Sequence, residues 1–196
     1  MSNEVPIETL IEALGNRNMA IREQAKTALR ERGPSMIDTL AEIVVSGNKY
    51  QSYEAATILS EYHDMRCFDA LSKVVDSPNV MVAQLASRTL MTYGKALAYE
   101  RLLDALPRAQ LLTQIQIVEL LKEVGDQKAF QPLITILRST DSAALRYCTI
   151  EALGMLGATN AISLIRSFKD DENHHVRDRV RIALERLEGG AADGNS

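Results

Sequence analysis

Two adjacent histidines, His174 and His175, stand near the end of the sequence in the segment DDENHHVRDRVRIALERL, residues 170–187. Imidazole and carboxylate side chains bind zinc or iron and act as acids and bases in catalysis, and clustered arginines bind phosphate groups. Residue type alone therefore leaves a metal site, a catalytic site and a basic patch open. The choice depends on whether the same pattern occurs earlier in the chain.

The histidines lack the partners that a metal site needs. Adjacent side chains on a helix diverge by about 100°, so His174 and His175 are not expected to converge on one ion. His63 stands far away in the sequence, and Cys67 and Cys148 form no paired motif. The sequence also has no glycine-rich phosphate loop and no Gly-x-Ser-x-Gly elbow. We therefore expect no metal, no cofactor and no catalytic residue.

The composition argues against nucleic acid and membrane partners. The chain has 196 residues and a net charge of −4, whereas binding to a phosphate backbone requires clustered positive charge. No apolar run approaches the ~18 residues that span a bilayer. The start, MSNEVPIETL, has neither a basic nor an apolar region typical of a secretory signal. We expect a cytoplasmic protein with reduced cysteines.

A repeat organises the whole chain. The segment IREQAKTALRERG has apolar or small residues at its first, fifth, eighth and ninth positions, and related thirteen-residue segments follow at intervals of 30 to 32 residues. The six segments begin at residues 21, 51, 82, 113, 145 and 176. This spacing of apolar positions predicts an amphipathic helix in each segment, and a shorter helical pattern precedes each one. Hereafter, frame positions count from these six starts.

The repeat predicts the fold class and the domain limits. No stretch alternates with period two, so we expect an all-α protein, a right-handed α-solenoid of about six helix-turn-helix repeats. Residues 5–188 would form one repeat domain. The polar, glycine-rich residues 189–196 would form a disordered tail. Four glycines stand where a helix end favours a left-handed residue: Gly33, Gly94, Gly125 and Gly157.

The last two repeats resemble a known family. The segment EALGMLGATNAISLIRSFKDDENHHVRDRVRIALERL resembles the HEAT repeat of the type named after phycobilisome lyases. The residues that match that pattern are Gly154, Leu156, Gly157, Asp171, Val176, Arg177, Ala183 and Leu184, and in the preceding repeat Gly125, Asp126, Asp141, Leu145 and Arg146. The middle of the chain departs from it, because Gln51, Ser52 and Thr113 replace the Val-Arg pair. The resemblance implies that Arg22, Arg146 and Arg177, with Asn16, Asp141 and Asp171 ahead of them, form a ladder between repeats.

The arginines of the last segment have two interpretations. Arg177, Arg179, Arg181 and Arg186 are interspersed with acidic residues. They would keep a terminal, solvent-facing repeat soluble, or they would form a basic docking patch. Asp171 and Asn173 are expected to cap the final helix.

The third and sixth frame positions point to a binding surface. The third position is Tyr53, Gln84, Ile115 and Tyr147 in the inner repeats, and the sixth includes Val118 and Ile150. Tyrosines and aliphatic residues on a concave strip are typical of a recognition surface. The alternative is that curvature of the superhelix buries the sixth position between repeats.

These patterns favour a non-enzymatic scaffold. We expect it to bind a protein or peptide on its concave helix face through Tyr53, Gln84, Ile115, Val118, Tyr147 and Ile150. The resemblance implies an alternative, a phycobilin lyase subunit or phycobilisome-associated factor, which would act on a phycobiliprotein. The chain would be part of an enzyme only if it is such a lyase subunit.

Overall fold

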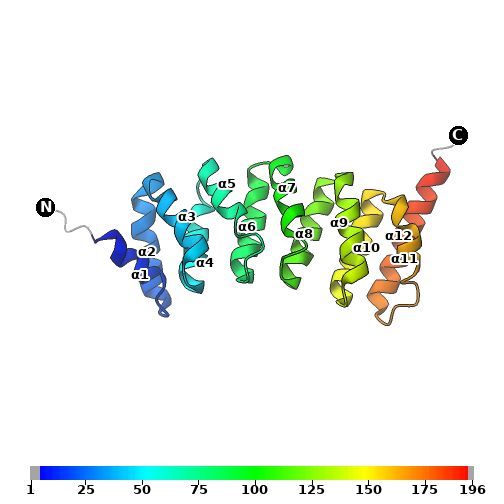
Figure 1. Cartoon of the computed structure of the whole chain (residues 1–196), viewed down its shortest axis with the longest axis horizontal. Coiled ribbons are helices and arrows are strands. Elements are labelled where there is room, and N and C mark those ends of the chain that lie inside the picture. The colour runs from blue at the N-terminus through cyan, green and yellow to red at the C-terminus, as the bar shows by residue number, and fades with distance from the viewer. Residues whose placement is uncertain (1–4, 194–196) are drawn as a thin grey trace. The chain divides into compact units, whose positions relative to one another are not determined.

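The computed structural model describes the backbone of residues 5–193 and the side chains up to residue 189. Every regular element in this part of the chain is helical (Figure 1). The chain divides into two compact units, one ending at Ala98 and the other beginning at Tyr99, and each is described by itself. No helix in the described part of the chain is both long and apolar enough to cross a membrane.

The first unit consists of three helix pairs. Its helices are α1 (Ile7–Leu14), α2 (Met19–Glu31), α3 (Ile37–Ser46), α4 (Lys49–Leu59), α5 (Met65–Ser72) and α6 (Val80–Thr92). Within each pair a shorter first helix packs against a second helix, and a 3-10 turn, η1 (Gly33–Met36), leads into α3. The second helices α2, α4 and α6 also contact one another in sequence. This packing of successive pairs is a stack of helix-turn-helix repeats.

The second unit repeats the same organisation. Its helices are α7 (Lys95–Ala105), which begins just before the boundary, α8 (Leu111–Val124), α9 (Phe130–Ser139), α10 (Ala143–Leu156), α11 (Ile162–Arg166) and α12 (His174–Asp193). The 3-10 turns η2 (Gln127–Ala129) and η3 (Thr159–Ala161) lead into α9 and α11. The second helices α8, α10 and α12 pack in sequence, as their counterparts do in the first unit. The expected all-α repeat fold is confirmed in both units.

The thirteen-residue frame matches the second helices throughout. Each second helix begins two residues before its frame start, for example at Met19 for the start at residue 21 and at His174 for the start at residue 176. The leucine at the ninth frame position is fully buried in five repeats: Leu29, Leu59, Leu90, Leu121 and Leu153. Leu184 is half-buried, and within the described residues no further repeat packs on its helix. These leucines belong to the core of the repeat stack.

Glycines allow two kinds of backbone geometry here. All four glycines expected in a left-handed conformation have positive φ, and Gly125 and Gly157 close α8 and α10 with φ of 82° and 78°. Gly154 has a different role, because a Cβ atom built there would lie 2.8 Å from the Cβ of Ala183. The absence of a side chain therefore lets α10 and α12 approach closely at this point.

The last helix runs past the expected domain limit. Helix α12 continues through Gly189 to Asp193, so residues 189–193 of the expected tail are helical, and residues 194–196 lie outside the described residues. Asn173 caps this helix by accepting the backbone N–H of His175 at 2.9 Å, and Asp171 accepts the N–H of Asn173. The expected cap by Asn173 is thus confirmed, whereas Asp171 binds the residue before the helix and does not cap it.

Candidate partner-binding pockets on the second helices

The structure separates the six candidate binding residues into two groups. Tyr53, Gln84, Ile115 and Tyr147, all at the third frame position, are half-buried on the second helices. Val118 and Ile150, at the sixth position, are fully buried. The expectation that Val118 and Ile150 contact a partner is therefore wrong. They lie in the core because α8 packs against α10 and α10 against α12, as the alternative interpretation of the sixth position had it.

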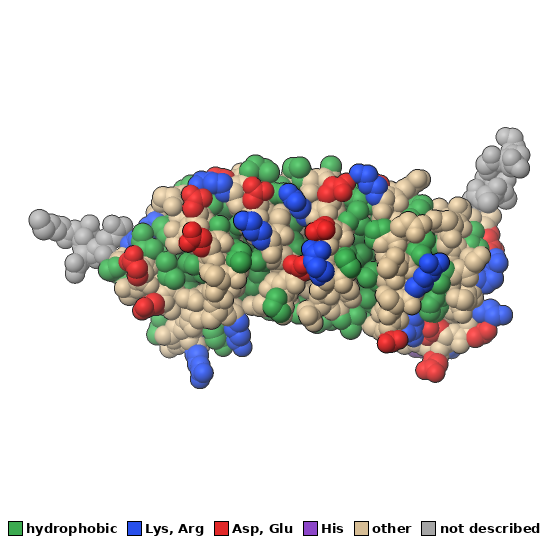
Figure 2. Space-filling view, viewed as in Figure 1, with side chains coloured by type: hydrophobic (Ala, Val, Ile, Leu, Met, Phe, Trp, Pro, Cys, Tyr) green, Lys and Arg blue, Asp and Glu red, His purple; other side chains and the backbone are tan. Residues whose placement is uncertain are grey.

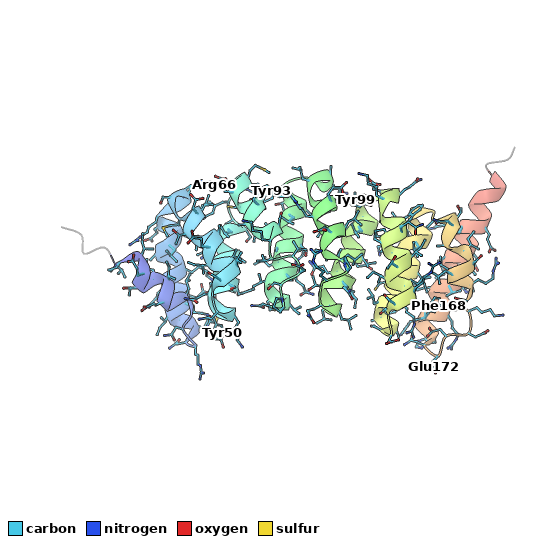
Figure 3. All side chains as sticks on the ribbon, in the orientation of Figure 1. Tyr50, Arg66, Tyr93, Tyr99, Phe168 and Glu172 are labelled. Atoms are coloured by element: carbon cyan, nitrogen blue, oxygen red, sulfur yellow. The ribbon has the colours of Figure 1, made fainter. Side chains whose placement is uncertain are left out.

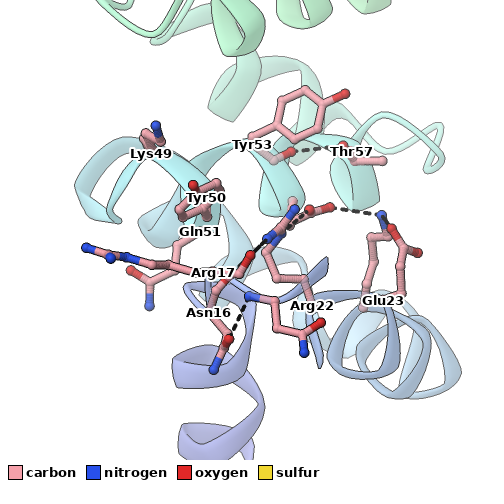
Figure 4. Close-up of polar contacts among 12 residues, drawn as sticks. Asn16, Arg17, Arg22, Glu23, Lys49, Tyr50, Gln51, Tyr53 and Thr57 are labelled. Carbon is pink, nitrogen blue, oxygen red and sulfur yellow. Dashed lines mark hydrogen bonds and ion pairs between the residues drawn. The ribbon is translucent and has the colours of Figure 1, made fainter. Parts of the chain in front are cut away.

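The Tyr53 pocket lies on the second helices of the first unit. It has a volume of about 450 Å³ and is lined by residues of α2, α4, the turn before α6 and the start of α6: Met19, Arg22, Glu23, Lys26, Lys49, Tyr50, Tyr53, Glu54, Thr57, Asn79 and Met81. Figure 4 shows Tyr50 and Tyr53 on α4, with Arg22 and Glu23 on the neighbouring helix α2. Met19 and Met81 are 65% and 58% exposed. The pocket thus combines exposed apolar side chains with charged groups.

A capping box fixes the start of α4 and with it this wall of the pocket. Asn48 accepts the backbone N–H groups of Tyr50 and Gln51, and the side chain of Gln51 accepts the N–H of Asn48 at 3.0 Å. The amide of Gln51 also donates to the carbonyl of Ile11 in α1. The departure of this repeat from the Val-Arg pattern at Gln51 therefore has a structural reason. The capping box that Gln51 forms with Asn48 holds Tyr50 at the N-terminal end of α4 (Figure 3).

A buried ion-pair cluster forms the floor of the Tyr53 pocket. Glu54 accepts Arg22 Nε on Oε1 and Lys26 Nζ on Oε2, both at 2.9 Å, and Lys26 also donates to Glu23 at 2.6 Å. The side chain of Glu54 is only 5% exposed, and those of Arg22 and Lys26 are 13% and 9% exposed. Because both cations come from α2 and Glu54 from α4, the cluster joins the first two repeats.

The protonation states in the cluster follow from these contacts. Burial by itself lowers the pKa of Lys26, but its hydrogen bonds to Glu23 and Glu54 outweigh that effect, and the pKa lies above its usual value. The hydrogen bond from Lys26 lowers the pKa of Glu23. Lys26 therefore keeps its charge at neutral pH although the side chain is buried.

The arginine at the second frame position makes the same contact in three repeats. The Nη1 of Arg22 donates to the carbonyl oxygens of Asn16 and Arg17, that of Arg146 to Asp141, and that of Arg177 to Asp171 and Glu172. Two of these arginines also reach the next repeat, Arg22 through Glu54 and Arg146 through an ion pair of 2.8 Å with Asp171. The expected contact between repeats is thus present for Arg22, with Glu54 in place of an aspartate, and for Arg146, whereas the contacts of Arg177 among the described residues lie within its own repeat.

The Tyr147 pocket lies on the second helices of the second unit. It also has a volume of about 450 Å³, and its lining comes from α10 and α12: Tyr147, His175, Asp178, Arg179, Arg181 and Ile182. Arg179 forms an ion pair of 3.0 Å with Glu151, and Arg181 forms one of 3.0 Å with Glu185. The side chains of Arg179 and Arg181 are 40% and 62% exposed, so these two cations remain in contact with solvent.

An alternating row of charges crosses the second helices of this unit. Lys122 on α8 pairs with Glu119 at 2.5 Å and with Glu151 on α10 at 3.1 Å, and Glu151 also accepts Arg179 from α12. Glu151 thus lies between two cations, as Glu54 does in the first unit. On the face that Figure 2 shows, acidic and basic side chains are likewise interspersed in each unit.

His174 and His175 lie together on α12, whereas Cys67 on α5 and Cys148 on α10 are buried free thiols. The rings of His174 and His175 stack with their centroids 3.8 Å apart, so the expected divergence is wrong; both residues belong to the first turn of α12. Within the described residues no group of three or more histidine, cysteine, aspartate or glutamate side chains is placed to hold a metal ion. Cys67 and Cys148 are buried, and burial raises the pKa of each thiol to about 11. Neither thiol is a reactive nucleophile at neutral pH.

The sequence pattern missed two features of the Tyr53 pocket. Tyr50 stands one residue before the frame start, outside the segments that were compared. Lys26, at the sixth frame position of the first repeat, is buried against Glu54, 28 residues later in the chain. The signal that could have indicated this pair is the spacing of Lys26 and Glu54, whose separation of 28 residues is close to the length of one repeat.

Part of the chain matches a known repeat family. Residues 99–185 match the family model of HEAT repeats. This match lies in the second unit and covers α7 to most of α12. No curated protein matches the sequence.

Solved structures resemble the chain over nearly its full length. They include an engineered protein at 17% identity, covering 94% of this chain and 97% of that one with a TM-score of 0.54. The complex of CpcE and CpcF of phycocyanin lyase from Nostoc sp. PCC7120 shares 20% identity over 98% of this chain and 69% of that one, with a TM-score of 0.55. A designed armadillo repeat protein shares 14% identity, covering 93% and 100%, with a TM-score of 0.50. The likeness concerns the fold, which is that of helical repeat proteins of the HEAT and armadillo type.

Proposed function

We propose that the protein is a non-enzymatic scaffold that binds a partner protein or peptide on its second helices. The observation that carries this proposal is that each unit has a pocket of about 450 Å³ at a third-frame tyrosine, Tyr53 in one unit and Tyr147 in the other. Helical repeats place the same frame position on the same face of each pair, which gives extended binding surfaces.

The chemistry of these pockets suits a protein ligand. Tyrosine offers a large contact area with a polar tip, and methionine adapts its shape to different apolar surfaces. Tyr53 lies beside the exposed Met19 and Met81, and Tyr147 lies beside Ile182, which is 39% exposed. Ile115, half-buried at the same frame position as Tyr147, extends the proposed surface onto α8. Gln84 does the same on α6 in the first unit.

The test is a quantitative pull-down with charge-introducing variants. Partners recovered from native lysate by the wild-type chain are compared with those recovered by Tyr53→Asp and by the double variant Ile115→Asp, Tyr147→Asp. A charge that is buried and unpaired at an interface costs several kcal/mol, so the affinity for a partner should fall at least about a hundredfold. Circular dichroism and thermal melting check that each variant remains folded.

Thr9→Asp and Thr135→Asp provide matched controls. Both residues are exposed on first helices, α1 and α9, so the added charge remains in water away from the proposed surface. These variants should recover every partner. If the folded pocket variants also retain all partners and the controls lose them, the binding surface is on the first helices and the proposal is wrong.

A second candidate function is that of a phycobilin lyase subunit or a phycobilisome-associated factor. It is supported by the resemblance of the last two repeats to the phycobilisome-lyase type of repeat, and by the likeness in fold to the CpcE and CpcF complex of phycocyanin lyase. The partner would then be a phycobiliprotein. Adding phycocyanobilin to the purified protein should produce a shifted and stronger red absorption, and an unchanged spectrum would contradict this candidate.

For either candidate we place the protein in the cytoplasm, with no nucleic acid or membrane among its partners. The net charge of −4 supports this, since affinity for nucleic acid and for anionic lipid surfaces rises with clustered positive charge.

A further inference from the structure

The acidic groups of the Tyr53 pocket are already committed to partners within the chain. Both carboxylate oxygens of Glu54 accept cations, Arg22 on one and Lys26 on the other, and Glu23 accepts Lys26. The lining contains three basic residues and two acidic ones, so its net charge is +1. A cationic ligand would therefore meet no free carboxylate in the lining of this pocket.

Lys49 supplies the uncompensated charge. Its ammonium lies 5.0 Å from the centre of the Tyr50 ring, and the guanidinium of Arg22 lies 4.7 Å from the same ring. Lys49 is exposed and forms no ion pair among the described residues. Two cations thus flank one aromatic ring, and only Arg22 is neutralised by a carboxylate. This arrangement attracts an anion to the side of Tyr50.

Apolar surface borders this charge on two sides. The Tyr53 pocket has Met19 and Met81 in its lining, and a second cavity of about 650 Å³ shares Lys49, Asn79 and Met81 with it. That second cavity is lined by Val44, Val45, Val74 and Val80, and Val45 is 56% exposed. Lys49 therefore lies at the junction of two cavities, each with apolar side chains in its wall.

We propose that the Tyr53 pocket and the adjoining cavity bind a peptide segment in which an acidic residue is flanked by apolar residues. The carboxylate pairs with Lys49 beside Tyr50. The apolar side chains on either side of it occupy the space next to Met19 on α2 and Val45 on α3. This inference rests on the proposed scaffold function and specifies the chemistry of the partner for the first unit.

Peptide selection tests the inference and does not require that the partner be identified first. A random peptide library displayed on phage is selected against the immobilised full chain, and peptides that also bind Tyr53→Asp are removed by counter-selection. The remaining peptides should be enriched in Asp or Glu next to an apolar residue. A synthetic copy of the best peptide, with its acid changed to the corresponding amide, should bind at least about tenfold more weakly in fluorescence anisotropy.

Charge reversal in the protein gives the matched test. Lys49 is the first residue of α4, where an acidic side chain is favourable to the helix, so Lys49→Glu should fold normally. It should weaken the acidic peptide about tenfold and bind more tightly a peptide carrying Lys in place of the acid. Lys73→Glu, the same charge change at an exposed residue after α5, should alter both affinities less than about twofold.

The outcomes separate this inference from the scaffold proposal. Peptides that depend on Tyr53 but show no acidic enrichment, or that bind Lys49→Glu as well as the wild type, would overturn the acidic-peptide inference and leave the scaffold proposal standing. Failure to select any peptide would also overturn the inference, while the pull-down variants still decide the scaffold proposal. Equal loss with Lys49→Glu and Lys73→Glu would mean that net charge, and no specific contact, controls binding, which contradicts the proposed site.

Discussion

Each unit has a glutamate held between two cations from neighbouring second helices, but only one of these glutamates is shielded from water. In the first unit the side chain of Glu54 is 5% exposed, and its partners Arg22 and Lys26 are 13% and 9% exposed. In the second unit Glu151 is 24% exposed, and its partners Lys122 and Arg179 are 14% and 40% exposed. The charge cluster is therefore shielded from water in the first unit, where both cations come from α2, and partly solvated in the second, where they come from α8 and α12.

The cause of the difference lies beside Glu151. A cavity of about 170 Å³ opens there, lined by Glu151, Gly154, Met155, Arg179 and Ile182 among others. Arg179 and Ile182 belong to α12, which has no following repeat in the described chain to cover it. Glu54 belongs to α4, which is packed between α2 and α6, and Glu151 belongs to α10, which is packed between α8 and α12, so both glutamates have a second helix on each side. The two clusters therefore differ in this cavity and in the exposure of Arg179, and not in the number of second helices around the glutamate.

The charged side chains of the Tyr53 pocket are accordingly expected to be held in one conformation, whereas those of the Tyr147 pocket are expected to change conformation more easily. A buried, fully paired cluster holds Arg22 and Lys26 in one geometry, so the first pocket is preorganised for its ligand. The partly exposed Arg179 and Arg181 can exchange partners at little cost. We therefore expect the first unit to supply specificity and the second to tolerate variation in what it binds.

The largest expected effect comes from neutralising the two glutamates. Glu54→Gln leaves the buried Arg22 without a balancing charge and leaves Lys26 with the more exposed Glu23 alone, so it should cost about 3–5 kcal/mol of unfolding free energy. Glu151→Gln acts on partly solvated pairs and should cost about 1 kcal/mol or less. Urea unfolding followed by circular dichroism measures both. Equal costs would mean that burial does not distinguish the two clusters.

The next effect concerns the core leucines at the ninth frame position. Leu153 and Leu121 are fully buried between two repeats, so Leu153→Ala or Leu121→Ala should cost about 2–5 kcal/mol. Leu184→Ala, in the half-buried position of the last repeat, should cost less. Arg186→Ala, on exposed surface of α12, should fall within about ±0.5 kcal/mol. Thermal melting ranks the four variants, and a cost for Leu184→Ala as large as that for Leu153→Ala would contradict the role assigned to the missing neighbour.

The smallest effect is the dependence of stability on pH at Asp171. Burial acts to raise the pKa of this carboxyl, but the backbone N–H of Asn173 and the guanidinium of Arg146 outweigh it, so the pKa lies below its usual value of 3.8. Its contribution is therefore present above the unfolded pKa and is lost as the pH falls through the lower folded pKa.

The corresponding variant is Asp171→Asn. At neutral pH it should be less stable than the wild type by about 1–2 kcal/mol, and the difference should shrink toward zero below about pH 3. Urea midpoints measured across this range give the difference directly. A gap that stays constant with pH would show that the loss is one of packing, not of charge.

Much of the fold could be predicted from the sequence, because a helical repeat encodes its contacts locally. The period of 30 to 32 residues, the leucine at the ninth position and the four glycines were enough to place every second helix within two residues. The half-buried state of Tyr53 and Tyr147 also agrees with the frame. These features depend on residues within one helix pair, where hydrophobic spacing determines which side faces the core.

The rest depends on contacts between pairs, which the frame does not contain. Val118 and Ile150 were expected on the surface and are buried, because the next second helix covers the sixth position. Lys26, also at the sixth position, is buried for the same reason. Its partner Glu54 lies 28 residues later in another segment, so a pattern within one segment does not indicate the pair. Tyr50 was missed because it lies in the first turn of α4, one residue before the frame start.

Site-specific photocrosslinking tests the central claim, that partners bind on the second helices, most directly. A photoreactive amino acid is placed at Tyr53 or Tyr147 in the full chain, and at Thr9 or Thr135 in two controls on exposed first-helix positions. After irradiation in native lysate, the crosslinked products are compared by gel mobility and mass spectrometry. We expect the same discrete partner bands from positions 53 and 147 and none from positions 9 and 135. Discrete bands from the first-helix positions, with none from either tyrosine position, would contradict the claim.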